Sequence, residues 1–223
     1  MVGMLVIKIM NVDDNLTTQR IEAFSDAVFA IAITLLVLEI RLPEHGTTST
    51  ANLAKDLVNL IPSFFAYILS FAMIGSYWVN HHYIFRLYRQ TNHIFSLLNV
   101  LFLMCIAFLP FPTAVLGSHL SDVDRQQTAV AFYAFGLLLP SAAWLVIWLY
   151  ASSRGRLTDP KLDPSFTRYL TRQYIVFCVM HLIALITSFF QPVFGLILAT
   201  GLTLLYLLPS KSPVYRVYPP PSP

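Results

Sequence analysis

The chain has 223 residues, of which 57% are hydrophobic and only 11% are charged. A water-soluble domain carries about 25% charged residues, so this composition excludes an ordinary soluble fold and indicates a protein that crosses a membrane several times. The formal net charge of +3 comes from dispersed basic residues, and this dispersion gives no footprint for a nucleic-acid partner.

Neither cysteine is placed for a disulfide or a metal site. Cys105 and Cys178 lie inside apolar runs, and the sequence contains no cluster of cysteine and histidine. The motifs of hydrolases, metalloproteases and nucleotide-binding enzymes are also missing from the sequence. We therefore expect neither an enzyme nor a protein with a resident cofactor or metal.

The first predicted helix covers residues 18–42, after a lead-in of residues 1–17. It begins with an acidic segment that contains Glu22 and Asp26, and twelve uncharged residues follow at 27–38. Twelve apolar residues alone fit either a buried helix or part of a membrane span. Because five more hydrophobic stretches follow, we expect this helix to cross the bilayer.

One face of this helix carries a narrow stripe of branched side chains. At about 100° per residue, Leu35 lies about 40° to one side of Ile31 and Leu38 about 20° to the other, with Thr34 about 60° away. The acidic start of the helix, including Asp26, lies on the opposite side. The stripe faces another helix, lipid, or its own copies around a pore. Spacing alone favours simple packing, although rings of apolar side chains also gate pores by dewetting.

Five further helices complete a six-helix, all-α membrane domain at residues 18–208. Pro62 lies inside the second, while Pro110 and Pro112 near the end of the third predict a kink or an early stop. The tail at 209–223 is too rich in proline for a helix. The predicted ranges are 52–86, 92–116, 128–151, 168–190 and 193–208.

The distribution of basic residues predicts the orientation in the membrane. About eleven of the 14 lysines and arginines lie before the first helix, after the sixth, and in alternate loops between them. The opposite loops hold only Arg41, Lys55 and Arg125. By the positive-inside rule both termini are cytoplasmic, in a multi-pass protein of the cell membrane.

Polar residues gather in a second place, at the end of the second helix. Trp78, Asn80, His81 and His82 lie there. Adjacent histidines point about 100° apart on a helix, so the pair is poorly suited to one metal ion. A belt at the membrane interface explains this cluster, and solvation at the interface explains the acidic start of the first helix.

A family resemblance gives both clusters another reading. The motif Arg20-x-x-x-Phe24-Ser25-Asp26, followed directly by the apolar run 28–36, resembles the signature of the lysosomal potassium channel family (transmembrane protein 175) in its prokaryotic branch. The resemblance continues at 78–85, at Asn99 and at 108–113. It covers the first three helices, and the last three match only in hydrophobic character and number.

The resemblance implies a homotetramer in the lipid bilayer, with the first helix of each subunit around a central pore for K+. The expected activity is a leak-like, potassium-selective conduction without the Thr-Val-Gly-Tyr-Gly filter. Ile31, Leu35 and Leu38 would form successive apolar constrictions, with Ile31 the narrowest. Thr34 would contribute to selectivity together with Ile31.

The resemblance also favours a hydrogen-bonded network that holds the helices together within and between subunits. In this reading His81 is the partner of the motif on the first helix. The residues assigned to this network are Arg20, Phe24, Ser25, Asp26, Trp78 and His81.

The main alternative is a secondary transporter for a cation or a proton-coupled solute. It would use Asp26, Glu22 and His81 as a protonation site, and the apolar stripe would only pack. A structural membrane protein without transport is a further alternative. A channel dissipates a potassium gradient without a second ion, whereas a transporter saturates and responds to the coupled ion.

Overall fold

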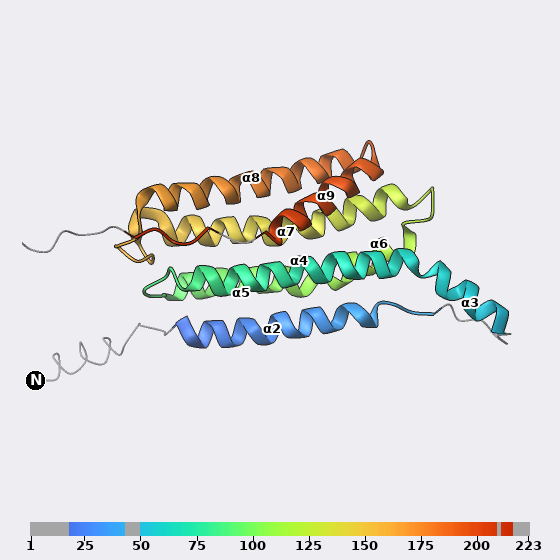
Figure 1. Ribbon diagram of the computed structural model, residues 1–223, viewed down its shortest axis with the longest axis horizontal. Coiled ribbons are helices and arrows are strands. Elements are labelled where there is room, and N and C mark those ends of the chain that lie inside the picture. The colour runs from blue at the N-terminus through green and yellow to red at the C-terminus, as the bar shows by residue number, and fades with distance from the viewer. Residues whose placement is uncertain (1–17, 43–49, 209–210, 216–223) are drawn as a thin grey trace, which may run out of the picture.

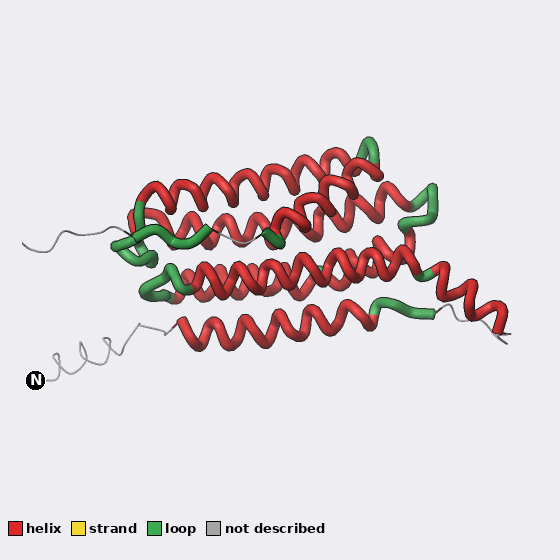
Figure 2. Tube along the Cα trace, viewed as in Figure 1, coloured by secondary structure: helices red, strands yellow, loops and turns green. Residues whose placement is uncertain are grey.

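The computed structural model describes residues 18–42, 50–208 and 211–215, and the first two of these ranges are helical apart from short connections (Figures 1 and 2). The predicted lead-in of residues 1–17 and most of the predicted tail lie outside the described residues. With the labels of Figure 1, the helices are α2 (Thr18–Leu38), α3 (Thr50–Asn59), α4 (Ile61–Phe85), α5 (His93–Phe108), α6 (Pro110–His119), α7 (Gln126–Ser152), α8 (Pro164–Ser188) and α9 (Pro192–Tyr206), with a short 3-10 turn at Ser153–Gly155.

The long helices lie side by side in one bundle, with α2 and α8 at opposite edges and α4, α5 and α7 between them (Figure 1). Helix α7 is central, because it contacts α5, α6, α8 and α9. Within the described residues, five spans, with α5 and α6 counted as one, are long and apolar enough to cross a membrane. Helix α9 is apolar but has only 15 residues, or about 22 Å against the roughly 30 Å of a hydrocarbon core. The predicted all-α membrane fold is confirmed, and the sixth helix is short, as its predicted range of 193–208 already indicated.

The prediction of one continuous second helix at 52–86 is wrong, because the segment divides at Leu60 into α3 and α4. Pro62 is the cause. It lacks the amide N–H that would bond to the carbonyl of Val58, and its ring clashes with that carbonyl. Pro62 therefore occupies the first turn of α4, where the missing N–H costs nothing.

The predicted kink of the third helix is confirmed at Leu109, between α5 and α6. Pro110 cannot donate to the carbonyl oxygen of Ile106. The amide of Leu109 donates to it instead, at 3.1 Å. The tighter turn satisfies the buried carbonyl group, so the chain bends without an unpaired backbone group at Ile106.

The fifth helix begins earlier than the predicted residue 168. The Asp163 side chain caps α8 by accepting a hydrogen bond from the amide of Ser165 at 2.7 Å, and Pro164 occupies the first helical position. An aspartate followed by proline is a strong start signal for a helix, so the second Asp-Pro pair belongs to α8 and not to the preceding loop.

The loops at one end of the bundle are joined to each other and to the tail. Tyr88, between α4 and α5, pairs as a short antiparallel bridge with Thr158, between α7 and α8. Leu162 forms a second bridge with Tyr215 of the tail. The described part of the tail, residues 211–215, contains no helix and lies against the start of α8.

Candidate functional site

Helix α2 has one face inside the subunit and one face outside it. Ser25, Phe29, Ala32 and Leu36 are buried, at spacings of four, three and four residues that place them on one side of the helix. This side packs on α4 and α5, and Figure 1 shows α2 as the outermost helix of its edge.

The predicted stripe lies on the other face and is uncovered within the subunit. Ile31, Leu35 and Leu38 are 59%, 40% and 61% exposed, and Thr34 is also exposed. Side chains with this exposure are not packed inside their own subunit, although the spacing of the stripe alone favoured such packing. Lipid or other copies of the stripe remain as its surroundings.

Thr34 makes the local backbone bond that is usual for a threonine in a helix. Its hydroxyl lies 3.0 Å from the carbonyl oxygen of Ala30 and 2.9 Å from that of Ile31. The single hydroxyl hydrogen is used by the backbone. The lone pairs of the oxygen consequently face outward, where they can accept a hydrogen bond or coordinate a cation.

A buried chain of hydrogen bonds ties the inner face of α2 to α5 and α4. The Ser25 hydroxyl donates to the carbonyl of Ile21 at 2.7 Å and accepts from the amide nitrogen of Asn99 at 3.0 Å. The Asn99 carbonyl oxygen lies 3.1 Å from Nε2 of His81. Ser25 has no second hydrogen to give, so Asn99 must turn its NH2 group toward Ser25 and its oxygen toward His81. It follows that His81 carries its hydrogen on Nε2.

Aromatic side chains enclose this chain of hydrogen bonds. The ring of His81 stacks on Phe85 with centroids 4.0 Å apart and meets the edge of Phe29 at 5.6 Å. The rings of Phe102 and Trp144 also lie close to His81, with centroids at 6.3 Å and 6.0 Å. The network is thus held in an apolar cage at the junction of α2, α4, α5 and α7, which makes an unpaired polar atom there costly.

A second, separate bond joins α2 to α4 at the surface of the bundle. The indole N–H of Trp78 donates to the carboxylate of Asp26 at 2.9 Å. Both side chains are exposed, so this contact is a surface link beside the buried Ser25–Asn99–His81 chain. Asp26 and His81 therefore belong to different branches and do not share a hydrogen bond.

The remaining residues assigned to the network lie apart from it within the subunit. Arg20 and Phe24 are exposed, and Glu22 is half-buried. Among the described residues Arg20 and Glu22 have no ion pair. His81 reaches the motif on α2 only through Asn99, so the expected direct bond between them is replaced by a bridge.

Comparison with known proteins identifies the family of the chain. Residues 20–110 match the family model of the endosomal/lysosomal potassium channel TMEM175. A potassium channel of Chamaesiphon minutus is 43% identical over 172 residues, which cover 77% of this chain and 84% of that channel. The chain belongs to the TMEM175 family.

Solved structures and animal relatives agree with this membership. The crystal structure of a lysosomal potassium-selective channel TMEM175 homolog from Chamaesiphon minutus matches with a TM-score of 0.76 at 38% identity, covering 85% of this chain and 95% of that one. The endosomal/lysosomal proton channel TMEM175 of mouse is 31% identical over 145 residues, 60% of this chain and 29% of that protein. The TMEM175 family thus has members named for potassium and members named for protons.

The part of this chain that matches the TMEM175 family model, residues 20–110, includes both faces of α2. It also includes the residues of both hydrogen-bonded links, Ser25–Asn99–His81 and Asp26–Trp78. Asn99 is one of the positions of the family resemblance, but no role was predicted for it, although it is the bridge between Ser25 and His81. The signal for it was a lone amide in a span with a mean hydropathy of 2.4, where a buried polar side chain needs a partner on another helix.

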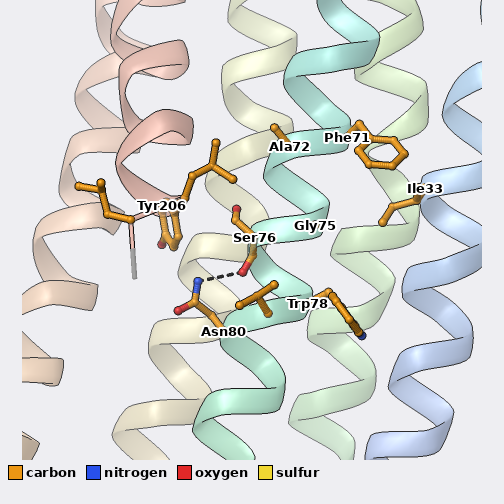
Figure 3. Close-up of a pocket in the computed structure, with 11 residues that line it drawn as sticks. Ile33, Phe71, Ala72, Gly75, Ser76, Trp78, Asn80 and Tyr206 are labelled. Carbon is orange, nitrogen blue, oxygen red and sulfur yellow. Dashed lines mark hydrogen bonds between the residues drawn. The ribbon is translucent and has the colours of Figure 1, made fainter. Parts of the chain in front are cut away.

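An apolar groove of about 490 Å³ lies between α2, α4 and the end of α9, on the side of α2 that carries Ile33 and not the stripe (Figure 3). Ile33 and Phe71 stand on one side and Tyr206 on the other, with Gly75 and Ser76 on the floor. The described residues of its wall include no carboxylate and no histidine. This groove is therefore unsuited to the protonation site that a coupled transporter needs.

Proposed function

We propose that this chain is the subunit of a potassium-selective cation channel that conducts without coupling to a second ion. The observation that carries the proposal is the division of α2 into a hydrogen-bonded inner face and an exposed stripe of Ile31, Thr34, Leu35 and Leu38. The names of the Chamaesiphon minutus relatives support potassium as the permeant ion.

In this proposal four subunits place α2 around a central axis, with the stripes facing inward. At a rise of about 1.5 Å per residue, Ile31, Leu35 and Leu38 form rings about 6 Å and about 4.5 Å apart along the axis. Such closely spaced apolar rings exclude water from a narrow pore and restrict conduction to a leak. Ile31 is the proposed narrowest ring.

Thr34 is the proposed selectivity residue beside Ile31. Fourfold symmetry would repeat its outward lone pairs as a ring of oxygens in an otherwise apolar passage. These oxygens can replace part of the hydration shell of a cation. Because the hydroxyl hydrogen is held by the backbone, the ring would present acceptors, which favours cations over anions.

The polar residues of α2 support the pore without lining it. Ser25, with Asn99 and His81, fixes the inner face of α2, and Asp26 with Trp78 fixes its edge. Arg20 and Phe24 are exposed in the single subunit, and we propose that they make contacts between subunits. The charge bias of the loops supports cytoplasmic termini and a cell-membrane location.

The experiment is ion flux from liposomes that contain the purified full chain. A potassium gradient is imposed, a proton-sensitive dye reports the compensating current, and sodium then replaces potassium. Potassium flux that needs no second ion, with slower sodium flux, supports the proposal. Exchange that appears only with an opposing proton gradient contradicts it and supports a transporter that uses Asp26, Glu22 or His81.

A further inference from the structure

We propose that the groove between α8 and α9, at the end of the bundle where the basic loops lie, binds an anionic glycerophospholipid. Its headgroup would contact Arg172 and Lys211, and one acyl chain would follow the exposed apolar side chains of α9. This inference concerns lipid binding and does not depend on conduction.

The groove combines a polar end with apolar walls. It has a volume of about 510 Å³, with Tyr169, Arg172 and Lys211 at the polar end and residues such as Val176 and Leu205 along its length. A ligand that fits must therefore carry negative charge at one end and hydrocarbon at the other. A phospholipid has this construction.

The shortness of α9 creates the groove. Helix α8 has 25 residues and α9 only 15, and the two run antiparallel through the turn at Gln191. If α9 follows α8 back from this turn, it ends opposite residues near Tyr174, so the first turns of α8 have no α9 neighbour. Arg172 stands at this boundary, about 12 Å from the start of α8.

The tail holds Lys211 at the same boundary. Its ammonium group lies 4.6 Å from the centre of the Tyr169 ring, and its backbone carbonyl accepts a hydrogen bond from the hydroxyl of Tyr83. Three residues later, the carbonyl of Val214 accepts from the amide of Asp163 at 2.9 Å. The second positive charge is thus positioned by contacts with Tyr169 of α8 and Tyr83 of α4.

These two positive charges are not neutralised by the described part of the protein. Its one ion pair joins Asp122 and Arg125, far along the chain from the groove. The nearest carboxylate in sequence, Asp163, caps the start of α8 through Ser165. A cation near the hydrocarbon boundary is expensive unless it reaches a counter-charge, and the phosphate of a lipid headgroup provides one.

The test measures lipid retained by the intact purified protein. Native mass spectrometry counts bound phosphatidylglycerol and, in a parallel titration, phosphatidylcholine, which shares the phosphate but has no net charge. The test variant combines Arg172→Gln with Lys211→Gln. The control combines Arg154→Gln with Lys161→Gln, which removes the same charge from the exposed loop before α8.

We expect the wild type to retain phosphatidylglycerol over phosphatidylcholine, and the affinity to fall roughly fivefold for each groove charge removed. The loop control should bind as the wild type does. Equal binding of the two lipids, undiminished binding by the Arg172/Lys211 variant, or an equal loss in the loop control would overturn the proposal. Leu205→Trp, which fills the groove and keeps both charges, should also displace the lipid.

Discussion

Replacing Asn99 by leucine should destabilise the subunit because it leaves a buried donor without a partner. Asn99 bridges Ser25 and His81, and the His81 side chain is only 1% exposed. The serine keeps its bond to Ile21, whereas the Nε2–H of His81 loses its acceptor. The network therefore fails at the histidine.

The magnitude follows from the two lost bonds. An unsatisfied buried donor costs about 1–3 kcal/mol, and a hydrogen bond between membrane helices contributes about 0.6 kcal/mol on average. We expect Asn99→Leu to lower the free energy of unfolding by about 2–3 kcal/mol. The same substitution at the exposed Asn59 should change it by less than about 0.5 kcal/mol.

A double-mutant cycle separates this mechanism from a loss of shape. His81→Phe removes the donor and keeps an aromatic ring between Phe29 and Phe85. Because replacing both partners by apolar groups is nearly neutral, the double variant should be more stable than the sum of the single changes predicts, by about 1–2 kcal/mol.

The assay is unfolding in mixed micelles of dodecyl maltoside and dodecyl sulfate at a fixed protein concentration. Tryptophan fluorescence is the readout, and Trp144 is a local probe because its ring lies 6.0 Å from that of His81. Additive single and double variants would refute the bridge, because they would mean that His81 does not depend on Asn99 for its hydrogen bond.

Three further predictions concern the outer face and edge of α2. Ile31→Asn should wet the narrowest ring and raise potassium flux several times over. The control Ile33→Asn, on another face of α2, should leave the flux unchanged. Equal flux in both variants would mean that the stripe only packs and does not line a pore. Thr34→Val should lower the preference for potassium over sodium while Thr34→Ser keeps it, as measured by reversal potentials in bilayers; unchanged selectivity in the valine variant would remove the oxygen ring. Asp26→Ala should remove the hydrogen bond to Trp78, at a cost of about 1 kcal/mol, and reduce the yield of tetramer in size-exclusion chromatography. A full yield of tetramer with normal flux would mean that the Asp26–Trp78 bond has no role in assembly.

The sequence predicts the helices well because hydropathy alone identifies them. Its predicted boundaries differ from the structure at Pro62 and Pro164, whereas the bend before Pro110 was expected as a kink or an early stop. Pro62 begins a new helix, Pro110 bends one, and Pro164 opens α8 behind an aspartate cap. In the sequence, each of these prolines is compatible with a kink inside a helix or with the first turn of a new helix. Which of the two forms depends on whether neighbouring groups can bond to the carbonyl oxygen four residues before the proline.

The stripe on α2 was visible in the sequence because it follows from the period of the helix. The bridge through Asn99 was not, because Ser25 and Asn99 are 74 residues apart and His81 and Asn99 are 18 apart. A single sequence marks each as a polar residue in need of a partner and does not say which one it meets.

The Asn99 bridge holds α2 near its N-terminal end, so a tilt of the helix moves its C-terminal end most. Its hydrogen bonds hold the helix at Ser25, whereas the buried residues beyond that point, Phe29, Ala32 and Leu36, make apolar packing contacts without directional bonds from their side chains. A tilt of about 5° around Ser25 would move Ile31 by about 0.8 Å and Leu38 by about 1.7 Å, given a rise of about 1.5 Å per residue. In the proposed pore, a displacement of this size would change the width of the ring at Leu38 more than the width of the ring at Ile31.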